Sequence, residues 1–279
     1  MILPLFYVDD VIKRALAEDI NYIDVATDYL IDENQRDKAY LVAKENGVLC
    51  GIDIAMRVFT LLDETFVCQI NKHDGDFVNK GDIIAEYEGK TVFLLKGERT
   101  ALNLLQQLSG VATATARAVE GVKGTNAQIT DTRKTVPTLR ALQKYAVTCG
   151  GGKNHRFNLS DAAMLKDNHI DAGGGIANAV AALRKKIGHT VKIEVETRDL
   201  DEVRQAVEAG ADIIMLDNMS LEEMREAVIF INGRAKTEAS GGITPENVRQ
   251  VAETGVDIIS LGAITHSVKA MDISMKMVK

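Results

Sequence analysis

The chain has 279 residues, a formal net charge of −7 and 46% hydrophobic residues, with no tryptophan and three prolines. This composition suffices for a large aliphatic core in one or two domains and favours buried parallel strands. Because the chain is acidic, with a pI of about 5.4, it lacks the basic character of general nucleic-acid-binding proteins. We find no signal peptide and no apolar run that would span a bilayer, so we expect a cytoplasmic protein that binds neither nucleic acid nor membranes.

The first third of the chain is typical of a mixed α and β domain. Residues 8–17 predict an amphipathic helix and residues 53–62 a second one, whereas residues 39–95 otherwise consist of short β-like runs. Four dipeptides that end in glycine predict the turns between these runs: Asn46-Gly47, Asp74-Gly75, Lys80-Gly81 and Glu88-Gly89. Residues 97–122 then predict one long helix with a break at Ser109-Gly110.

From residue 125 onwards, strands and helices alternate. Candidate strands begin near six residues: Gln128, Met164, Lys192, Ile213, Thr237 and Ile258. Helical patterns fall between them, over residues 139–149, 176–187, 200–210, 221–231 and 245–255. Repeated βα units imply a parallel sheet. Their number and short loops favour a closed or nearly closed α/β barrel, although the spacing also permits an open doubly wound sheet.

Carboxylates lie on or at the ends of these candidate strands, where α/β barrels place their reacting groups. A carboxylate inside a parallel sheet is costly unless it is paired, hydrated or bound to a ligand. We therefore interpret Glu196 and Asp217 as functional, with Ser220 as the cap of the next helix. For Glu194, an ion pair with Lys192 inside the barrel explains the residue equally well.

Two glycine-rich strand ends indicate a phosphate site. Residues 240–242 (SGG) precede a predicted helix start at residues 244–245, and residues 262–263 (GA) lead into another near Thr265. Loops after the last strands of a barrel, together with helix N-termini, commonly bind phosphate.

A basic cluster over residues 130–170 stands out in this acidic chain. It contains nine basic residues: Arg133, Lys134, Arg140, Lys144, Lys153, His155, Arg156, Lys166 and His169. A local cluster of this kind indicates a pocket for a small, highly anionic ligand. Strand-end positions favour a binding role for Arg133, Lys134 and Lys166, whereas we expect Arg140 and Lys144 on a solvated helix face. The role of Lys153 is left open.

The three cysteines, Cys50, Cys68 and Cys149, form no CxxC pair and have no ligand-like spacing with histidine. We predict buried or incidental thiols in a reducing compartment.

Together these motifs resemble the quinolinate phosphoribosyltransferase family, the decarboxylating nicotinate-nucleotide pyrophosphorylases of NAD biosynthesis. The matching segments span most of residues 97–274 and are GERTALNLLQQLSGVAT, DTRKTVPTLRALQKYAV, CGGGKNHRFNLSDAAMLKDNHI, KIEVE, IIMLDNM, ASGGI and SLGAITHSVKAMDIS. A local departure lies at Val136 and Thr138, where the family often has Thr and Gly.

The resemblance implies an α/β fold in two domains. An α+β sandwich-like N-terminal domain would span residues 1–110, and an incomplete, open α/β barrel with the active site would span residues 111–265. A C-terminal helix over residues 266–279 would join the first domain. The resemblance also implies a homodimer, or a higher oligomer, in which Arg99 reaches across the subunit interface. The charge of Arg99 opposes the dipole of the helix that it is predicted to begin, which agrees with a role elsewhere.

The implied reaction transfers phosphoribosyl from phosphoribosyl pyrophosphate to quinolinate and releases CO₂, with Mg²⁺ as cofactor. Lys166, Glu196 and Asp217 would be catalytic, and the two carboxylates would face the metal directly or through the substrate. The implied substrate-binding residues are Arg99, Thr132, Arg133, Lys134, His155, Arg156, Lys166, Glu196, Asp217, Ser240, Gly241, Gly242, Gly262 and Ala263.

Three competing hypotheses remain open. A molybdenum-transport-associated paralogue would share the fold and use another substrate, although the full basic set argues against it. A biotinyl or lipoyl carrier is suggested by DGDFVNKGDIIAEYEG and by Lys276 in MKM, although Lys276 lies in a helical pattern and not at a hairpin tip. An aldolase that forms a Schiff base on Lys166 is the third.

Overall fold

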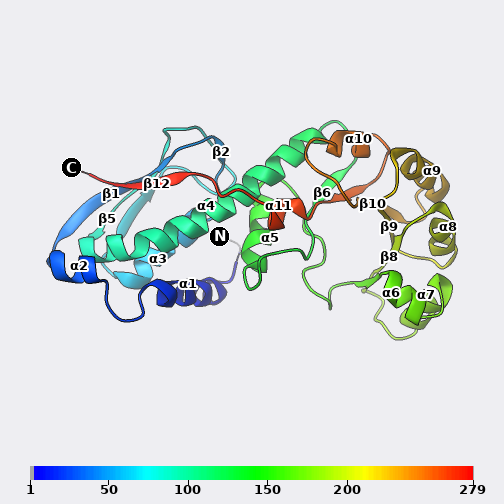
Figure 1. The fold of residues 1–279 in the computed structure, drawn as a ribbon, viewed down its shortest axis with the longest axis horizontal. Helices are drawn as coiled ribbons and strands as arrows, with labels where there is room; N and C mark the ends of the chain where they lie inside the picture. Colours follow the sequence, from blue (N-terminus) through cyan, green and yellow to red (C-terminus); the bar gives the residue numbers. More distant parts are fainter. Residues whose placement is uncertain (1–2, 279) are drawn as a thin grey trace. The chain divides into compact units, whose positions relative to one another are not determined.

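The computed structural model describes residues 3–278, and the chain divides into two compact units (Figure 1). Unit 1 comprises the chain up to Ala116, Val136–Gly151 and the chain from Ser267 on, whereas unit 2 comprises Arg117–Thr135 and Gly152–His266. Residues 136–151, which the sequence pattern places with the barrel, therefore belong to unit 1. A close approach explains this: a Cβ on Gly150 would lie 2.4 Å from the carbonyl oxygen of Ala112.

Unit 1 is built on an antiparallel sheet with the strand order β12-β1-β5-β3. These strands are β12 (Ile273–Met277), β1 (Arg36–Ala43), β5 (Ile83–Lys90) and β3 (Val67–Ile70), and a smaller ladder joins β2 (Gly47–Val48) to β4 (Phe77–Val78). The helices are α1 (Leu5–Asp19), α2 (Val25–Leu30), α3 (Ile52–Leu62), the first part of α4 (Thr91–Gly121) and α5 (Arg140–Cys149). Phe59 of α3 stacks on Phe66 and Tyr87, with ring centroids 5.3 and 5.2 Å away, and so joins helix and sheet in one core.

Three predictions for this unit are wrong. Gly89 lies within β5, opposite Asp37, and not in a turn. A Cβ there would come within 3.1 to 3.3 Å of Asp63, Leu94 and Phe66, so a close approach accounts for this strand glycine. Helix α4 continues through Gly110, where a Cβ would meet the carbonyl oxygen of Lys269 at 2.4 Å, so the glycine admits the C-terminal segment.

The third wrong prediction is the C-terminal helix over residues 266–279. Its last part is strand β12, which pairs antiparallel with β1 in the register Leu41↔Met275. The buried side chains of this strand alternate, since Ile273 and Met275 are buried while Lys276 is exposed. A strand at the sheet edge satisfies this period of two, as a helix would not.

Unit 2 is a six-stranded parallel sheet with the order β6-β11-β10-β9-β8-β7. The strands are β6 (Gln128–Thr130), β7 (Ala163–Leu165), β8 (Ile193–Thr197), β9 (Ile213–Asp217), β10 (Lys236–Ser240) and β11 (Ile258–Ser260). This is the cyclic order of a barrel. Within residues 3–278 no ladder joins β6 to β7, so the barrel is open at that seam. The predicted α/β fold with an incomplete barrel is confirmed.

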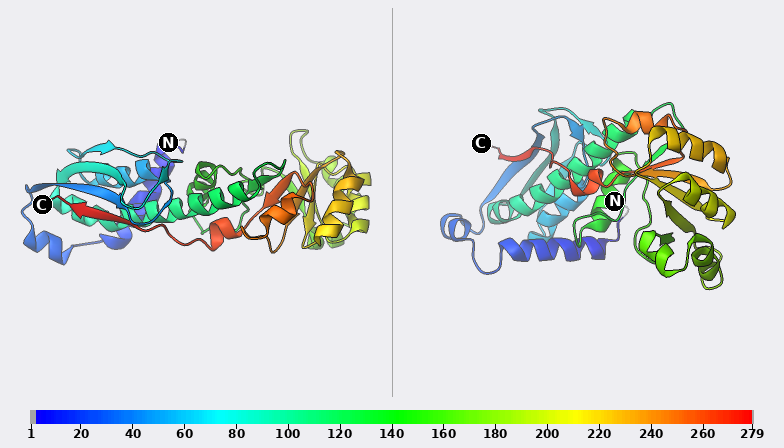
Figure 2. Two further views of the ribbon diagram at one scale, coloured as in Figure 1. Left: turned by 90° about the horizontal axis from the view of Figure 1, so that it is seen from above. Right: turned by 45° about the vertical axis from the view of Figure 1, so that its right-hand side comes forward.

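Helices follow the strands and cover the outer face of this sheet (Figure 2). They are α6 (Asp167–Ala172), α7 (Ile176–Arg184), α8 (Leu200–Glu208), α9 (Leu221–Ile231) and α10 (Val248–Ala252). The short helix α11 (Ala263–His266) follows β11 and does not belong to this layer. The predicted cap at Ser220 is confirmed, since its side chain accepts a hydrogen bond from the Glu223 amide and Glu223 reaches back to the Ser220 amide.

Two aspartates at equivalent positions, Asp212 and Asp257, directly precede β9 and β11. Asp212 accepts a hydrogen bond from the Ile193 amide at 2.8 Å, and Asp257 accepts one from the Thr237 amide at 2.9 Å. Each carboxylate thereby ties the start of one strand to its neighbour. Lys192 is 3.3 Å from Asp212, so the interpreted ion pair between Lys192 and Glu194 is wrong.

Candidate active site

The carboxyl ends of the six parallel strands bring the predicted carboxylates and the glycine turns together in unit 2. Asp217 stands opposite Ser240 in the β9–β10 ladder, and Glu196 stands opposite Met215 in the β8–β9 ladder. Thr132 and Lys134 follow β6, Lys166 follows β7, and Gly262 follows β11. The sheet topology therefore gathers residues that are far apart in the sequence at one edge.

Lys166 forms an ion pair with Glu196 across the ends of β7 and β8. The lysine side chain is 46% exposed and the glutamate 15%, so the pair is partly open to solvent. An exposed pair contributes little to stability, because water screens it. The pair is therefore better placed for exchange with a charged ligand than for holding the fold.

The turn after β10 is shaped by Asn218. The side-chain amide of Asn218 donates to Asp217 at 2.8 Å, while its backbone amide donates to the carbonyl of Ser240 at 2.9 Å. Gly241 has φ +92°, and a Cβ there would lie 2.2 Å from Oδ1 of Asn218. Only glycine fits this position, so the backbone of the turn lies directly against the residues that hold Asp217.

The predicted helix start at residues 244–245 is wrong. Helix α10 begins at Val248 with Asn247 as its N-cap residue, and the Thr244 amide donates to the Asn247 side chain at 2.8 Å. The second predicted start near Thr265 is also displaced, since α11 spans Ala263–His266. Any anion site at residues 240–242 therefore depends on the loop itself.

The turn after β11 packs on the loop after β6. Thr265 donates a hydrogen bond to the carbonyl oxygen of Lys134 at 2.7 Å, and the Lys134 amide donates to Thr132 at 3.0 Å. A Cβ on Gly262 would come 3.0 Å from Cδ of Lys134, so the lysine stem runs over the glycine. The predicted residues of these two segments thus form one contiguous surface.

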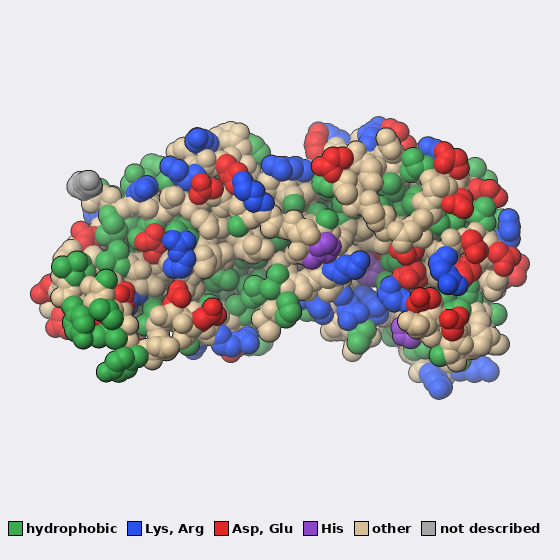
Figure 3. Space-filling view, viewed as in Figure 1, with side chains coloured by type: hydrophobic (Ala, Val, Ile, Leu, Met, Phe, Trp, Pro, Cys, Tyr) green, Lys and Arg blue, Asp and Glu red, His purple; other side chains and the backbone are tan. Residues whose placement is uncertain are grey.

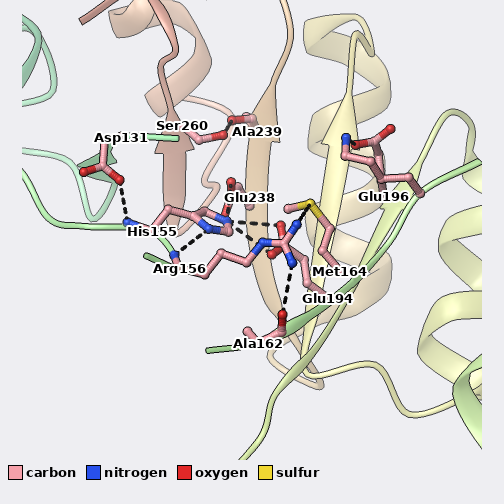
Figure 4. A network of polar contacts seen from close by, with 11 residues as sticks. Asp131, His155, Arg156, Ala162, Met164, Glu194, Glu196, Glu238, Ala239 and Ser260 are labelled. Atoms are coloured by element: carbon pink, nitrogen blue, oxygen red, sulfur yellow. Dashed lines mark hydrogen bonds and ion pairs between the residues drawn. The ribbon is translucent and has the colours of Figure 1, made fainter. Parts of the chain in front are cut away.

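His155 contacts two buried carboxylates inside the sheet (Figure 4). Its Nε2 atom is 3.2 Å from Oε2 of Glu194 on β8 and 3.4 Å from Oε1 of Glu238 on β10. Both glutamates are 1% exposed, and these two oxygens have no hydrogen-bond partner in the part of the chain that the structure describes. Because unpaired buried charge is costly, the imidazole is the group that compensates them.

The ring of His155 is oriented from its other side by the backbone. The Arg156 amide lies 2.8 Å from Nδ1 of His155, and this contact holds the ring with Nε2 towards the two glutamates. Burial lowers the pKa of His155, but the two nearby carboxylates of Glu194 and Glu238 outweigh it and raise the pKa. Burial has the opposite effect on an acid, so it raises the pKa of Glu194, and the negative charge of Glu238 raises that pKa further.

Arg156 is half-buried beside this cluster. Its guanidinium donates to the carbonyl oxygen of Ala162 at 3.1 Å and contacts Sδ of Met164 at 3.4 Å. Burial and then the charge of Arg133 lower the pKa of Arg156. The two guanidinium groups are thus close enough to repel each other, and an anion bound near both would relieve that repulsion.

Sequence reasoning missed two supports of this site. Asp131 is fully buried and holds the loop of His155, since it accepts the His155 amide at 2.9 Å and the Asn154 side chain at 2.7 Å. Glu238 is the other. An acidic residue in the middle of a buried parallel strand, as in KTEAS, is the signal that could have found it.

Several predicted residues are placed differently from expectation. Lys144 is 1% exposed, so the prediction of a solvated face is wrong for it. Arg99 is exposed, but α4 begins at Thr91, so Arg99 is not at the helix start and the dipole argument fails. It lies in unit 1, and its cross-subunit role stays a prediction. Arg133 and Lys153 are exposed in unit 2.

Away from this edge, charges of both signs alternate over the outer helices of unit 2 (Figure 3). Exposed ion pairs account for several of them: Arg204–Glu226, Arg225–Glu222 and Arg249–Glu253. Such a surface offers no continuous basic stripe. The described helices include none that is both long and apolar enough to cross a membrane.

Comparison with known proteins decides the family. The profile of the quinolinate phosphoribosyl transferase N-terminal domain matches residues 24–109, and that of the C-terminal domain matches residues 111–276. The chain belongs to the quinolinate phosphoribosyltransferase family. The predicted membership is confirmed.

Relatives and solved structures agree with this family over the whole length. The chain is 48% identical to a probable nicotinate-nucleotide pyrophosphorylase [carboxylating] of Bacillus subtilis over 92% of this chain and 89% of the relative. A Synechocystis protein of the same name is 43% identical over 99% and 94%. The crystal structure of NadC from Streptococcus pyogenes has a TM-score of 0.96 at 44% identity, covering 100% of this chain and 99% of that one.

Proposed function

We propose that this chain transfers the phosphoribosyl group of phosphoribosyl pyrophosphate to the ring nitrogen of quinolinate and releases CO₂, giving nicotinate mononucleotide and pyrophosphate. The observation that carries the proposal is the family match over both domains, joined to a strand-end site that holds the matching charged residues. Quinolinate brings two carboxylates, and its co-substrate brings a phosphate and a pyrophosphate. A pocket with several cations suits that load.

In this proposal the basic residues divide by ligand. Arg133 and Arg156 hold the carboxylates of quinolinate. His155, fixed by the two buried glutamates, positions the segment that carries Arg156. Lys134 and Lys166 hold phosphate oxygens or the second carboxylate as point charges. The turns at residues 240–242 and 262–263, with Ser240, Gly241, Gly242, Gly262 and Ala263, hold the 5′-phosphate through backbone amides. Thr132 fixes the backbone of Lys134.

Glu196 and Asp217 act at the ribose. Positive charge develops at C1 as pyrophosphate leaves, and carboxylates nearby stabilise it. Displacement of Glu196 from Lys166 by an incoming anion would free both side chains for the substrates. After ribosylation the ring nitrogen is cationic, so the electron pair left by loss of the adjacent carboxylate is stabilised within the ring itself.

Carboxylate oxygens are the donors that Mg²⁺ prefers, and both Glu196 and Asp217 are only partly buried, so the donor set fits this ion. When bound there, directly or through the substrate, Mg²⁺ would neutralise the leaving pyrophosphate. We further propose a cytoplasmic homodimer, or a higher oligomer, in which Arg99 completes the site of the partner subunit.

The test is to incubate the purified protein with quinolinate, phosphoribosyl pyrophosphate and Mg²⁺ and to measure both CO₂ and the mononucleotide. Equal amounts of the two products are expected, and nicotinate in place of quinolinate should give no CO₂. Turnover of another acid but not of quinolinate would instead support the paralogue with a different substrate.

The carrier and aldolase hypotheses have less support. Lys276 lies within β12 opposite Tyr40, and not at the hairpin tip that a carrier lysine needs. Lys166 is ion-paired with Glu196, whereas a Schiff-base lysine must present a free amine to a carbonyl. Borohydride trapping with a carbonyl substrate should leave Lys166 unmodified.

A further inference from the structure

Two cysteines of unit 1 lie side by side, far from each other in the sequence. Cys50 follows β2 and is fully buried, and Cys149 is the last residue of α5 and is partly exposed. Their sulfur atoms and a carboxylate oxygen of Asp74 all lie within 4.8 Å of one another. We infer that Cys50 and Cys149 form a reactive thiol pair that a small disulfide oxidises to an intramolecular cross-link.

Helix α4 holds both cysteines in place. The Cys50 amide donates to Oγ of Ser109 at 3.0 Å, and that hydroxyl lies 3.2 Å from the carbonyl oxygen of Cys50. Next to Cys149, a Cβ on Gly150 would be 2.7 Å from Cβ of Thr115, so the end of α5 lies directly on the same helix. Both backbones are thus anchored, and the approach of the two sulfurs follows from the packing.

Asp74 fastens the two sides together without needing an ion. Its Oδ1 accepts the amides of Gly51 and Ile52 at 2.7 and 3.0 Å, directly after Cys50. Its Oδ2 accepts the hydroxyl of Tyr145 at 2.7 Å, one helical turn before Cys149. Because both oxygens already serve as structural acceptors, the cluster favours sulfur chemistry over a cation held by Asp74.

The two thiols have different tasks. Cys149 is partly exposed and Cys50 is fully buried, so an external disulfide reaches Cys149 first. The neighbouring Cys50 thiol lowers the pKa of Cys149, whereas burial raises the pKa of Cys50. Cys149 is therefore the attacking thiolate and Cys50 the resolving thiol. Cys68 is exposed on β3, outside this pair. Of the predicted buried or incidental thiols, the burial of Cys50 is confirmed.

The reaction balances with oxidised glutathione as the oxidant. The Cys149 thiolate attacks one glutathione sulfur, forms a mixed disulfide and expels one glutathione thiolate. Cys50 then loses its proton and attacks the sulfur of Cys149, which expels the second glutathione. Two protein thiols are oxidised, one glutathione disulfide is reduced to two thiols, and the protein gains one internal disulfide.

The experiment uses the wild-type chain and three variants. Cys68→Ser removes the exposed third thiol, whereas Cys50→Ser and Cys149→Ser each remove one member of the thiol pair. After treatment with oxidised glutathione, free thiols are counted in denaturant and non-reduced peptides are mapped by mass. In Cys68→Ser we expect the loss of both thiols, a peptide linking residues 50 and 149, and a higher urea midpoint of unfolding. Cys50→Ser should stop at a glutathione adduct on Cys149.

Two unlinked glutathione adducts on Cys68→Ser, or unreacted Cys50 and Cys149 in it, would overturn the inference. Circular dichroism of each variant controls for folding. The peptide map of Cys68→Ser decides the matter even when a pair variant does not fold. None of these readouts depends on the enzymatic activity, so the outcome is independent of the proposed function.

Discussion

Lys166, directly after β7, forms an ion pair with Glu196 at the end of the neighbouring strand β8. The pair links a residue of the basic cluster to the predicted carboxylates, and it lies partly in solvent. The carboxylate orients the lysine side chain, and a bound anion can take the place of that carboxylate. The pair therefore holds both side chains at the strand ends where the predicted carboxylates and basic residues meet.

Lys166→Ala should lower kcat/KM about 10²-fold or more, because a positioned charge near reacting anions contributes roughly 3 kcal/mol to the transition state. The fold should stay intact, since the pair is exposed and contributes little to stability. Steady-state kinetics and the unfolding midpoint measure the two effects. Lys166→Arg is the control that retains charge, and wild-type kinetics in Lys166→Ala would refute the assigned role.

Gly241→Ala should weaken the use of phosphoribosyl pyrophosphate and raise its KM. The new Cβ would collide with Asn218 and move the residues that support Asp217. Gly210→Ala is the matched control, since Gly210 also has positive φ, +76°, but nothing lies within 4 Å of its Cβ position. Both variants share a backbone strain of about 1 kcal/mol. Equal kinetics in the two would show that the Asn218 contact is irrelevant.

His155→Leu should lower the free energy of unfolding by about 3–5 kcal/mol, because it leaves two buried carboxylates without the imidazole. Adding Glu194→Gln to that variant should recover part of the loss by removing one buried charge, yet quinolinate turnover should stay low. Urea unfolding together with kinetics separates the two effects. If the double variant is no more stable than His155→Leu, the glutamates do not depend on the ring.

Asp212 should make stability depend on pH in the acid range. Burial raises the pKa of Asp212, but hydrogen bonds from the Ile193 amide and Arg184 outweigh it and lower the pKa. Its contribution is therefore present above the unfolded pKa of about 3.9 and is lost as pH falls through the folded value. Asp212→Asn should lower the free energy of unfolding by about 1–2 kcal/mol at pH 7. The stability of this variant should also fall less steeply than that of the wild type as the pH is lowered.

The control for that prediction is Glu222→Gln, which removes an exposed ion pair with Arg225 and should change stability by less than about 1 kcal/mol. The measurement is the urea midpoint at a series of pH values from 3 to about 7. If stability falls as steeply at low pH in Asp212→Asn as in the wild type, the Asp212 carboxylate is not the source of that fall.

A subunit-mixing experiment tests the cross-subunit role of Arg99. Arg99→Ala and Arg156→Ala should each be inactive alone, because each lacks one cation for the substrate. A heterodimer of the two would have one site with both arginines if Arg99 acts in the partner's site. Activity should therefore return on mixing, measured as CO₂ release by heterodimers purified with two tags. No return of activity in a verified heterodimer would place Arg99 in its own subunit's site.

The class of the fold and the family could be predicted from local patterns in the amino-acid sequence. The period of two in the strands, the βα repeats and the Ser220 cap are local signals, and six parallel strands follow from them. The strand-end rule also selected Glu196 and Asp217, because a parallel sheet places all carboxyl ends at one edge. These inferences depend on chemistry between residues that are near one another in the chain.

Only the tertiary structure decided contacts between distant segments. It showed that Glu194 and Glu238 both meet His155, that Gly89 and Gly110 mark close packing instead of a turn or a break, and that the C-terminal segment is a strand. No local pattern carries such information. A glycine permits a sharp turn and a close neighbour equally well, and a buried carboxylate does not name its partner until the sheet brings the two together.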